Sequence, residues 1–325
     1  MELKDIGEFS FIDAINENVI CNPTNVVVGI GDDCAVYRPT LNWEQLITID
    51  TMVEDVHFSF QYMNPFDIGY RLCTANFSDI AAMGGTPRQI VLSVAAPRTT
   101  GVAVLIDIYK GIKEQCKKFN VNIIGGDTVS TDGPMVLTVT VVGEVEQGTA
   151  VLRSGAKPGQ LVGVTNYIGY AATGLDALTY DLPDYTMTKI GHCRPEPQIE
   201  LGQWLHNIGA TSMNDISDGL SSELHEIAKA SNVDIIIDEQ AIPLHEETYA
   251  LAEFTNVRPV DYALYGGEDF QLVFTIPSHL EHIVKIHGGI TIIGQVIAGD
   301  GKVQMVTSNR HVETIEGKGF NHFGN

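Results

Sequence analysis

Four short acidic motifs flanked by glycine are spread along the chain, and they constrain its fold more than any other feature. They are Gly31-Asp32-Asp33, Gly125-Gly126-Asp127, Asp215-Ile216-Ser217-Asp218-Gly219 and Gly266-Gly267-Glu268-Asp269. Glycine lets a backbone approach a ligand closely or adopt positive φ, and a neighbouring carboxylate supplies the hard oxygen that Mg²⁺ prefers. We interpret the four motifs as one divided site for a polyphosphate bound through Mg²⁺.

The length of the chain predicts two domains, because 325 residues exceed the size at which one hydrophobic core stops growing. Apolar residues make up 44% and charged residues 18%, as in ordinary globular proteins. Between Gly148 and Gly159 the periodicity is interrupted by Ser-Gly-Ala-Lys-Pro-Gly. We therefore predict domains of residues 1–150 and 151–325.

The acidic charge of the chain limits its partners. A formal net charge of −22 repels nucleic acid and anionic membranes, which recruit proteins through Lys and Arg. A nucleotide fits only if divalent cations intervene.

The five cysteines form no Cys-x-x-Cys pair, and neither a signal peptide nor an apolar run of about 18 residues is present. We expect a cytoplasmic protein with no nucleic-acid or membrane partner.

Hydrophobic periodicity predicts a mixed α/β (α+β) fold. Strands are predicted at 46–49, 122–124, 135–145, 161–165, 233–237, 270–276, 290–297 and 303–306, and helices at 67–83, 101–119 and 219–230. The sequence contains no low-complexity segment or short-period repeat.

One carboxylate lies in the apolar stripe of the predicted helix 67–83. At about 100° per residue, Asp79 projects close to Ile68 and Leu72. Because burying an unpaired charge costs several kcal/mol, Asp79 must be protonated, paired with a base or bound to a metal. The alternative is a structural hydrogen bond, for example with Asn76.

Each acidic motif also has a simpler explanation. Asp-rich turns such as the one at residue 31 are common, the carboxylate of Asp50 suits a strand-end cap, and Gly125-Gly126-Asp127 suits a turn that follows a strand. Ser217 or Asp218 suits the N-cap of the next helix, whose N-terminus would also attract phosphate. Dismissing the site requires all of these independent explanations together.

With these motifs the chain resembles the thiamine-monophosphate kinase family, in the ATP-binding superfamily that includes aminoimidazole ribonucleotide synthetase. Further matching motifs are Gly7-Glu8-Phe9, Asp50-Thr51, Val56-His57-Phe58, Ser78 to Gly84 and Arg153-Ser154-Gly155-Ala156, so the resemblance covers nearly the whole chain. It implies direct in-line transfer of the γ-phosphoryl group of ATP to thiamine monophosphate, the last step of thiamine diphosphate biosynthesis. Positioning and charge neutralisation supply the catalysis, and no covalent nucleophile is expected.

The resemblance also implies roles for individual residues. Several Mg²⁺ ions are expected on Asp33, Thr48, Ile49 (through its carbonyl), Asp50, Asp79, Asp127, Asp215 and Asp218. ATP, as co-substrate, is expected on Tyr109, Gly126, Asp127, Arg153 and Ser217, and thiamine monophosphate on His57, Glu268 and Phe320. Asp50, Asp79, Asp127 and Arg153 would support the transfer.

Three positions depart from the family pattern. Phe320 stands where a Trp or Tyr is usual, Asp55 where many members have Gly, and Phe270 where Tyr is common. The expected fold is nonetheless the two-domain aminoimidazole ribonucleotide synthetase-like fold. Its N-terminal ATP/Mg-binding sheet joins a dimeric β-barrel, and its C-terminal α/β sandwich completes the ATP and substrate site. A homodimer would also cover the strand 135–145 if it lies at a sheet edge, although a single chain could cover it as well.

Two other functions stay open. Another enzyme of the superfamily could act on a different small substrate through the same ATP and Mg²⁺ framework. A non-catalytic Mg-ATP-binding sensor is the second alternative, although it would tolerate fewer metal ligands than the chain keeps. The chain has no P-loop, and Gly29-Ile30-Gly31 lacks the third glycine of a Rossmann motif.

Overall fold

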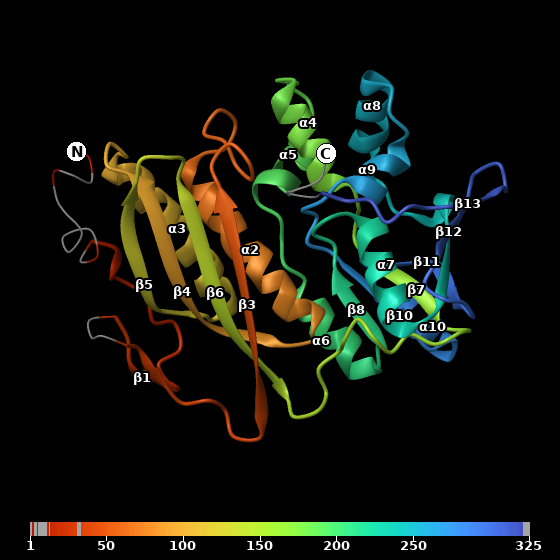
Figure 1. Ribbon diagram of the computed structural model, residues 1–325, viewed down its shortest axis with the longest axis horizontal. Helices are drawn as coiled ribbons and strands as arrows, with labels where there is room; N and C mark the ends of the chain where they lie inside the picture. Colours follow the sequence, from red (N-terminus) through yellow and green to blue (C-terminus); the bar gives the residue numbers. More distant parts are fainter. Residues whose placement is uncertain (1, 3–4, 6–11, 13, 31–33, 321–325) are drawn as a thin grey trace. The chain divides into compact units, whose positions relative to one another are not determined.

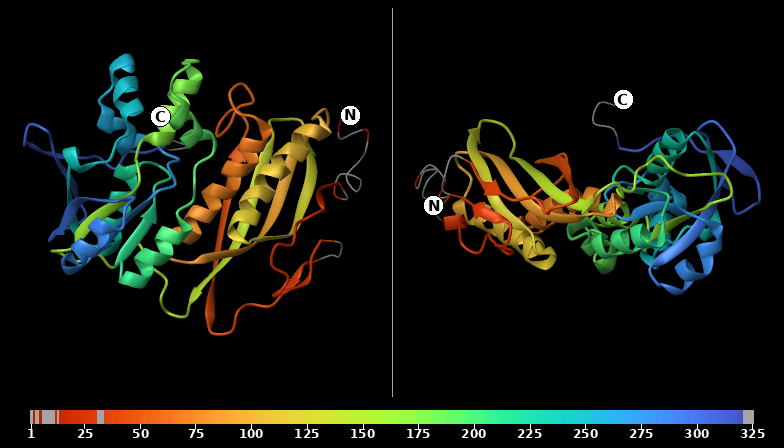
Figure 2. Two further views of the ribbon diagram at one scale, coloured as in Figure 1. Left: turned by 180° about the vertical axis from the view of Figure 1, so that it is seen from behind. Right: turned by 90° about the horizontal axis from the view of Figure 1, so that it is seen from below.

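The computed structural model describes residues 2, 5, 12, 14–30 and 34–320, which form two compact units (Figures 1 and 2). The first unit comprises Met1–Ile80 and Gly85–Thr149, and the second comprises Ala81–Gly84 and Ala150–Asn325. Within the described part, no helix is long and apolar enough to cross a membrane.

The first unit is a four-stranded sheet with two long helices on one face, seen in the left view of Figure 2. The sheet order is β3 (Trp43–Val53), β6 (Val136–Glu146), β4 (Thr86–Pro97) and β5 (Asn122–Thr131), and the helices are α2 (Pro65–Ala82) and α3 (Val102–Phe119). Only β4 and β5 pair in parallel. A separate two-stranded sheet joins β1 (Val26–Val28) to β2 (Val36–Tyr37).

The two helices touch through their backbones. A Cβ added at Gly69 of α2 would lie 1.9 Å from the carbonyl oxygen of Ile108, and one added at Gly111 of α3 would lie 1.9 Å from that of Phe66. No side chain fits at either position. Glycine therefore sets the close crossing of α2 over α3, and α2 in turn lies against β3.

The opposite face of this sheet, toward the viewer in Figure 1, carries no helix in the described part of the chain. Alternate residues of β3 point to it, and Ile47 and Ile49 are 71% and 61% exposed there. Val91 on β4 and Val129 on β5 are exposed as well. This uncovered face is thus rich in apolar side chains.

The second unit is built on a seven-stranded sheet. Its strands, in sheet order, are β13 (Val312–Thr314), β12 (Val303–Val306), β9 (Asp234–Asp238), β11 (Ile290–Ile297), β7 (Leu161–Thr165), β10 (Leu272–Ile276) and β8 (Ser212–Asp215). Its helices are α4 (Tyr170–Thr179), α5 (Thr186–Cys193), α6 (Ile199–Ile208), α7 (Leu220–Ser231), α8 (Glu246–Thr255), α9 (Pro259–Tyr265) and α10 (Glu281–Ile286). Two short 3-10 helices, Glu239–Ala241 and Ser278–Leu280, complete it.

The strand register gathers several loops at one end of this sheet. Leu272, at the start of β10, pairs with Asp215 at the end of β8, and Ile290, at the start of β11, pairs with Thr165 at the end of β7. The segments that follow β7 and β8 and the segment that precedes β10 therefore lie together. Two of the acidic motifs are in these segments.

Most of the predicted elements are confirmed, and the exceptions have physical causes. Strands 161–165, 290–297 and 303–306 coincide with β7, β11 and β12, and the three predicted helices are α2, α3 and α7. The predicted strand 122–124 is too short, because β5 continues through Gly125-Gly126-Asp127 to Thr131.

The predicted edge position of strand 135–145 is wrong, since β6 lies between β3 and β4. The edges of this sheet are β3 and β5 instead. The strand 270–276 begins two residues later than predicted, at Leu272, because Phe270 has φ = +50°, which belongs to a turn.

Candidate functional site

In the first unit, β3 and α2 bring two of the predicted metal ligands together. The hydroxyl group of Thr48 donates a hydrogen bond to Oδ2 of Asp79. Asp79 is half-buried. The alternative interpretation of Asp79, a structural hydrogen bond, is therefore met by Thr48. Asn76 is not the partner, because its amide group donates to the carbonyl of Leu72 and its oxygen accepts the backbone N–H of Asp50, both at 3.0 Å.

Asp50 belongs to the same cluster, because it points to the same face of β3 as Thr48. A hydroxyl oxygen and two carboxylates form the hard-oxygen donor set that suits Mg²⁺, which keeps several waters and phosphate oxygens as further ligands. In the described part of the chain, no three His, Cys, Asp or Glu side chains form a metal site by themselves. Asp33 lies outside the described residues.

Gly126 and Asp127 lie inside the edge strand β5, so the strand does not end before Gly125 as predicted, and the alternative interpretation as a turn is also wrong. A Cβ at Gly126 would lie 2.4 Å from the carbonyl oxygen of Leu92, so the close pairing with β4 requires glycine. Asp127 pairs with Ser93, which in turn pairs with Thr138. Asp127 is therefore exposed on the uncovered face, as is the side chain of Ile49. Within this unit, the sheet separates it from Asp50 and Asp79.

His57 lies in the turn that follows β3. Its Nδ1 accepts the backbone N–H of Val53 at 3.0 Å, so in the neutral ring the proton is on Nε2. Asp55 adopts φ = +61°, and Ser59 donates a hydrogen bond to its carboxylate at 3.0 Å. The positive φ explains why glycine suits this position in the family.

Tyr109, an expected ATP contact, is buried in α3 with 5% of its surface exposed. Burial raises the pKa of its hydroxyl group, which stays protonated. Because so little of Tyr109 is exposed, only a small part of its surface could contact ATP.

In the second unit, the acidic motifs at residues 215 and 266 are in direct contact. The backbone N–H groups of Glu268 and Phe270 donate to the carbonyls of Ser217 and Ile216 at 2.7 and 2.9 Å. A Cβ at Gly267 would lie 2.3 Å from the carbonyl oxygen of Ser217. The expected convergence of these two motifs is confirmed, and glycine permits it.

The segment that carries Phe320 closes on the same turn. The backbone N–H of Phe320 donates to the carbonyl oxygen of Asp218 at 3.2 Å, and a Cβ at Gly319 would lie 2.5 Å from the same oxygen. Phe320 is 53% exposed. Phe320, Glu268 and the turn at Ser217 and Asp218 thus form one cluster.

The alternative roles of Ser217 and Asp218 as helix caps are wrong. The N-cap of α7 is Gly219, at φ = +112°, and no side chain caps the helix. Asp215 is 4% exposed at the end of β8. The start of α7 consequently offers backbone N–H groups next to buried and half-buried carboxylates, which suits an anion that carries a metal.

The paired acids Glu268 and Asp269 have different surroundings. Asp269 is buried and accepts the backbone N–H groups of Gly169 and Ala171, at 2.6 and 2.8 Å, at the start of α4. Burial raises the pKa of Asp269 to about 7, against the opposing effect of these N–H donors. Asp269 therefore anchors α4, whereas Glu268 is partly exposed beside Ser217.

Sequence reasoning missed two buried polar residues beside Arg153. The Nε of Arg153 donates to Oδ1 of Asn214 at 3.0 Å, and the amide group of Asn214 donates to Oε2 of Glu223. Burial, and then the nearby carboxylate of Asp218, raise the pKa of Glu223 to about 7. Its spacing from Leu220 and Ile227, three and four residues away, marks it as a carboxylate on an apolar helix face, the pattern that singled out Asp79.

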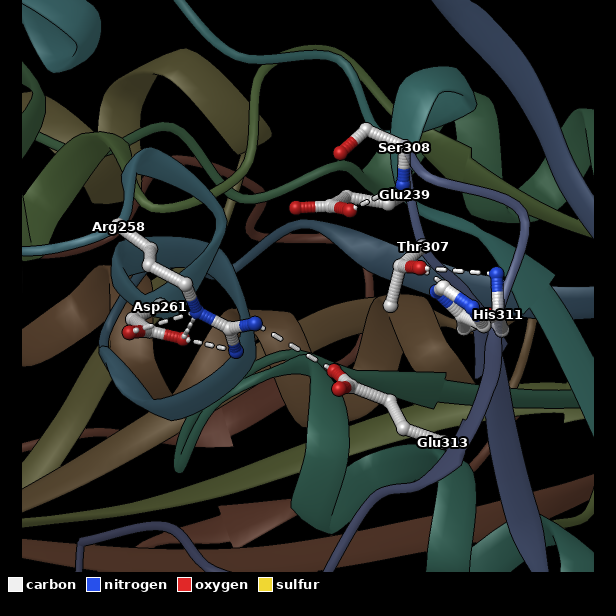
Figure 3. Close-up of polar contacts among 7 residues, drawn as sticks. All are labelled: Glu239, Arg258, Asp261, Thr307, Ser308, His311 and Glu313. Atoms are coloured by element: carbon white, nitrogen blue, oxygen red, sulfur yellow. Dashed lines mark hydrogen bonds and ion pairs between the residues drawn. The ribbon is translucent and has the colours of Figure 1, made fainter.

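Polar contacts away from this cluster hold the elements that lead to it (Figure 3). Arg258, at the N-cap of α9, contacts Asp261 at 2.8 Å and Glu313 of β13 at 3.5 Å. The backbone N–H of Ser308 donates to Glu239 at 2.6 Å. The segment after α9 continues to Gly266, and the segment after β13 continues to Phe320. The ion pairs of Arg258 therefore connect the two elements that precede these residues of the cluster.

Comparison with known proteins gives a consistent result. The model of the AIR synthase related protein N-terminal domain matches residues 31–145, and that of the C-terminal domain matches residues 160–306. The thiamine-monophosphate kinase of Bacillus subtilis (strain 168) is 40% identical over 331 aligned residues, which cover 98% of this chain and 100% of the relative.

Solved structures agree. The thiamine-monophosphate kinase of Stenotrophomonas maltophilia K279a has a TM-score of 0.83 at 30% identity, over 92% of this chain and 96% of its own. The complex of AaThiL with AMPPCP and TMP has a TM-score of 0.79 at 30% identity, over 99% of both chains.

Proposed function

Because this chain belongs to the thiamine-monophosphate kinase family, with its two AIR synthase related domains, we propose that it transfers the γ-phosphoryl group of ATP to thiamine monophosphate. One observation carries the proposal to the residues. Glu268 and Phe320, expected to bind the substrate, contact the turn of Ser217 and Asp218, expected to bind ATP and metal. Both kinds of group therefore meet at one place in the second unit.

The chemistry needs little from a general base. The phosphate of thiamine monophosphate is ionised at neutral pH, so its oxygen can attack the γ-phosphorus in line without losing a proton. Mg²⁺ ions, when bound, would neutralise phosphate charge. Thr48, Asp50 and Asp79 are proposed to hold Mg²⁺ in the first unit, and Asp215 and Asp218, as a separate set, are proposed to hold Mg²⁺ in the second. Arg153 would add a fixed positive charge.

Substrate recognition is assigned to three side chains. His57, whose ring is held by the hydrogen bond that its Nδ1 accepts from the backbone N–H of Val53, would contact the substrate. Phe320 would stack its exposed ring on the heterocycle, and Glu268 would accept hydrogen bonds or pair with positive charge. A cytoplasmic location stays a prediction.

We propose further that the protein is a homodimer that closes a β-barrel over the uncovered face of the first unit. Ile47 and Ile49 are mostly exposed there, and burying such side chains between two copies would stabilise the pair by about 1.5–3 kcal/mol each. Asp127 would then be enclosed at the interface. Replacing Ile47 with Lys should give monomers in sedimentation velocity, whereas a wild-type monomer at micromolar concentration would reject the dimer.

The activity is tested by incubating the protein with ATP, Mg²⁺ and thiamine monophosphate and identifying the product by chromatography. Thiamine diphosphate formed with one ADP for each product is the expected result. Thiamine and aminoimidazole precursors serve as control substrates. Release of ADP with one of the controls would favour another superfamily enzyme, and ATP binding without any turnover would favour a sensor.

A further inference from the structure

Arg153 lies in an irregular segment and its side chain is 53% exposed, yet its guanidinium group contacts two other side chains. The segment itself is anchored, since the carbonyl of Arg153 accepts the hydroxyl of Ser231 at 3.1 Å and the carbonyl of Leu152 accepts the backbone N–H of Met213 at 3.1 Å. The guanidinium group donates to Asn214 at 3.0 Å and pairs with Glu226 at 3.5 Å. These contacts use Nε and Nη1.

The two partners of the guanidinium group differ in burial. Asn214 is 3% exposed, whereas the side chain of Glu226 is 47% exposed. An exposed ion pair with a long contact fixes geometry weakly, because solvent screens it and both side chains can move. Orientation of Arg153 therefore depends on Asn214.

Asn214 is itself oriented by Glu223. Its oxygen accepts from Arg153, and its amide group donates to Oε2 of Glu223, which is also 3% exposed. The other oxygen of Glu223 accepts the backbone N–H of Asp218 at 3.4 Å. One buried carboxylate thus connects Arg153 on one side with the turn at Asp218 on the other.

We propose that Asn214 and Glu223 are positioning residues of the transfer reaction. They hold the guanidinium group of Arg153 in a single orientation, in which Nη2 makes no hydrogen bond within the described part of the chain and is available to a phosphate oxygen of ATP. The inference rests on the proposed function, in which Arg153 contacts ATP. It adds two residues that touch neither substrate nor metal but act through Arg153 and Asp218.

A double-mutant cycle tests the proposal, with Mg-ATP binding measured by calorimetry and thiamine diphosphate formation measured in parallel. If Asn214 acts through Arg153, N214L should weaken Mg-ATP binding about tenfold in the wild-type background and less than about twofold in the R153A background. A merely structural role would weaken binding equally in both backgrounds, and that result would overturn the proposal.

Two further variants keep the test decisive. E223Q retains the shape of the side chain and should show the same dependence on Arg153, so it replaces N214L if that variant fails to fold. E226Q removes the charge of the exposed partner of Arg153, which lies on α7 as Glu223 does. This variant should weaken Mg-ATP binding less than about threefold. A larger effect of E226Q than of N214L would also overturn the proposal.

The outcome separates this inference from the function. Wild-type protein that binds Mg-ATP but forms no thiamine diphosphate would reject the proposed activity, while the binding cycle would still decide the role of Asn214. Wild-type protein that binds no Mg-ATP would overturn both.

Discussion

The two units present their oxygen ligands in different ways. In the first unit, Thr48, Asp50 and Asp79 project from a regular strand and a regular helix. In the second, the turn at Ser217 and Asp218 is held by backbone hydrogen bonds and by glycines that leave no room for a side chain. The difference teaches that a ligand on a regular element can be replaced without changing the fold, whereas a ligand in a turn of this kind depends on the backbone around it.

Replacing Asp79 with Asn should have the largest effect on activity. The amide oxygen can still accept the hydrogen bond from Thr48, so the free energy of unfolding should change by less than about 1 kcal/mol. Loss of the carboxylate should lower the rate of thiamine diphosphate formation by at least about a hundredfold. Substantial retained activity would count against Asp79 as a metal ligand.

Replacing Gly267 with Ala should lower both the stability and the activity of the protein, unlike the change at Asp79. The new Cβ would lie 2.3 Å from the carbonyl oxygen of Ser217, so both the free energy of unfolding, by about 2 kcal/mol, and the activity should fall. Gly125→Ala is the matched control, because its Cβ would meet Val91 at an ordinary 3.4 Å. Equal losses in the two variants, measured by urea unfolding, would remove the contrast between the units.

Asp269 should make the stability of the second unit depend on pH. Its pKa in the folded protein, raised to about 7 by burial, exceeds that of the unfolded chain. The folded state therefore binds the proton more strongly, and its stability falls as pH rises from about 4 through 7. Glu223 acts in the same direction.

Asp269→Asn should reduce this fall between pH 5 and pH 8 by about 1–2 kcal/mol, measured by urea unfolding at both pH values. A wild-type stability that increases over the same range would show that the N–H donors of Gly169 and Ala171 outweigh burial.

Arg258→Ala should have the smallest effect. Its ion pairs with Asp261 and Glu313 are partly exposed, so we expect a loss of no more than about 1 kcal/mol and an unchanged rate of thiamine diphosphate formation. Glu313→Gln is the control for the weaker pair. A large loss of activity in R258A, measured in the same assay, would mean that the ion pairs of Arg258 are needed to hold α9 and β13 in the positions that the site requires.

The sequence predicted features that depend on local pattern. The apolar stripe of helix 67–83 singled out Asp79, and the family motifs marked the turn at Asp215 to Gly219. Glu223 shows the same stripe pattern but was missed, because its partner Asn214 lies on another element. Whether a carboxylate in an apolar stripe serves a ligand or a neighbour is decided by tertiary contacts.

Glycine-rich motifs were harder to interpret. Gly125-Gly126-Asp127 has the composition of a turn, yet it continues β5, because Gly126 lets the strand approach the carbonyl of Leu92. Glu268 and Asp269 were treated as one acidic pair, although only the structure shows that Asp269 holds the start of α4. In both cases the deciding partner is distant in sequence.

The glycine crossing of α2 and α3 makes the helix that carries Asp79 a lever. Gly69 lies ten residues before Asp79, a distance of about 15 Å along the helix axis. A side chain at Gly69 would push α2 away from α3, and a tilt of only about 5° would move Asp79 by about 1.3 Å, a displacement large enough to cost about a hundredfold in rate. Inactivating substitutions should therefore arise at a contact that no substrate ever reaches.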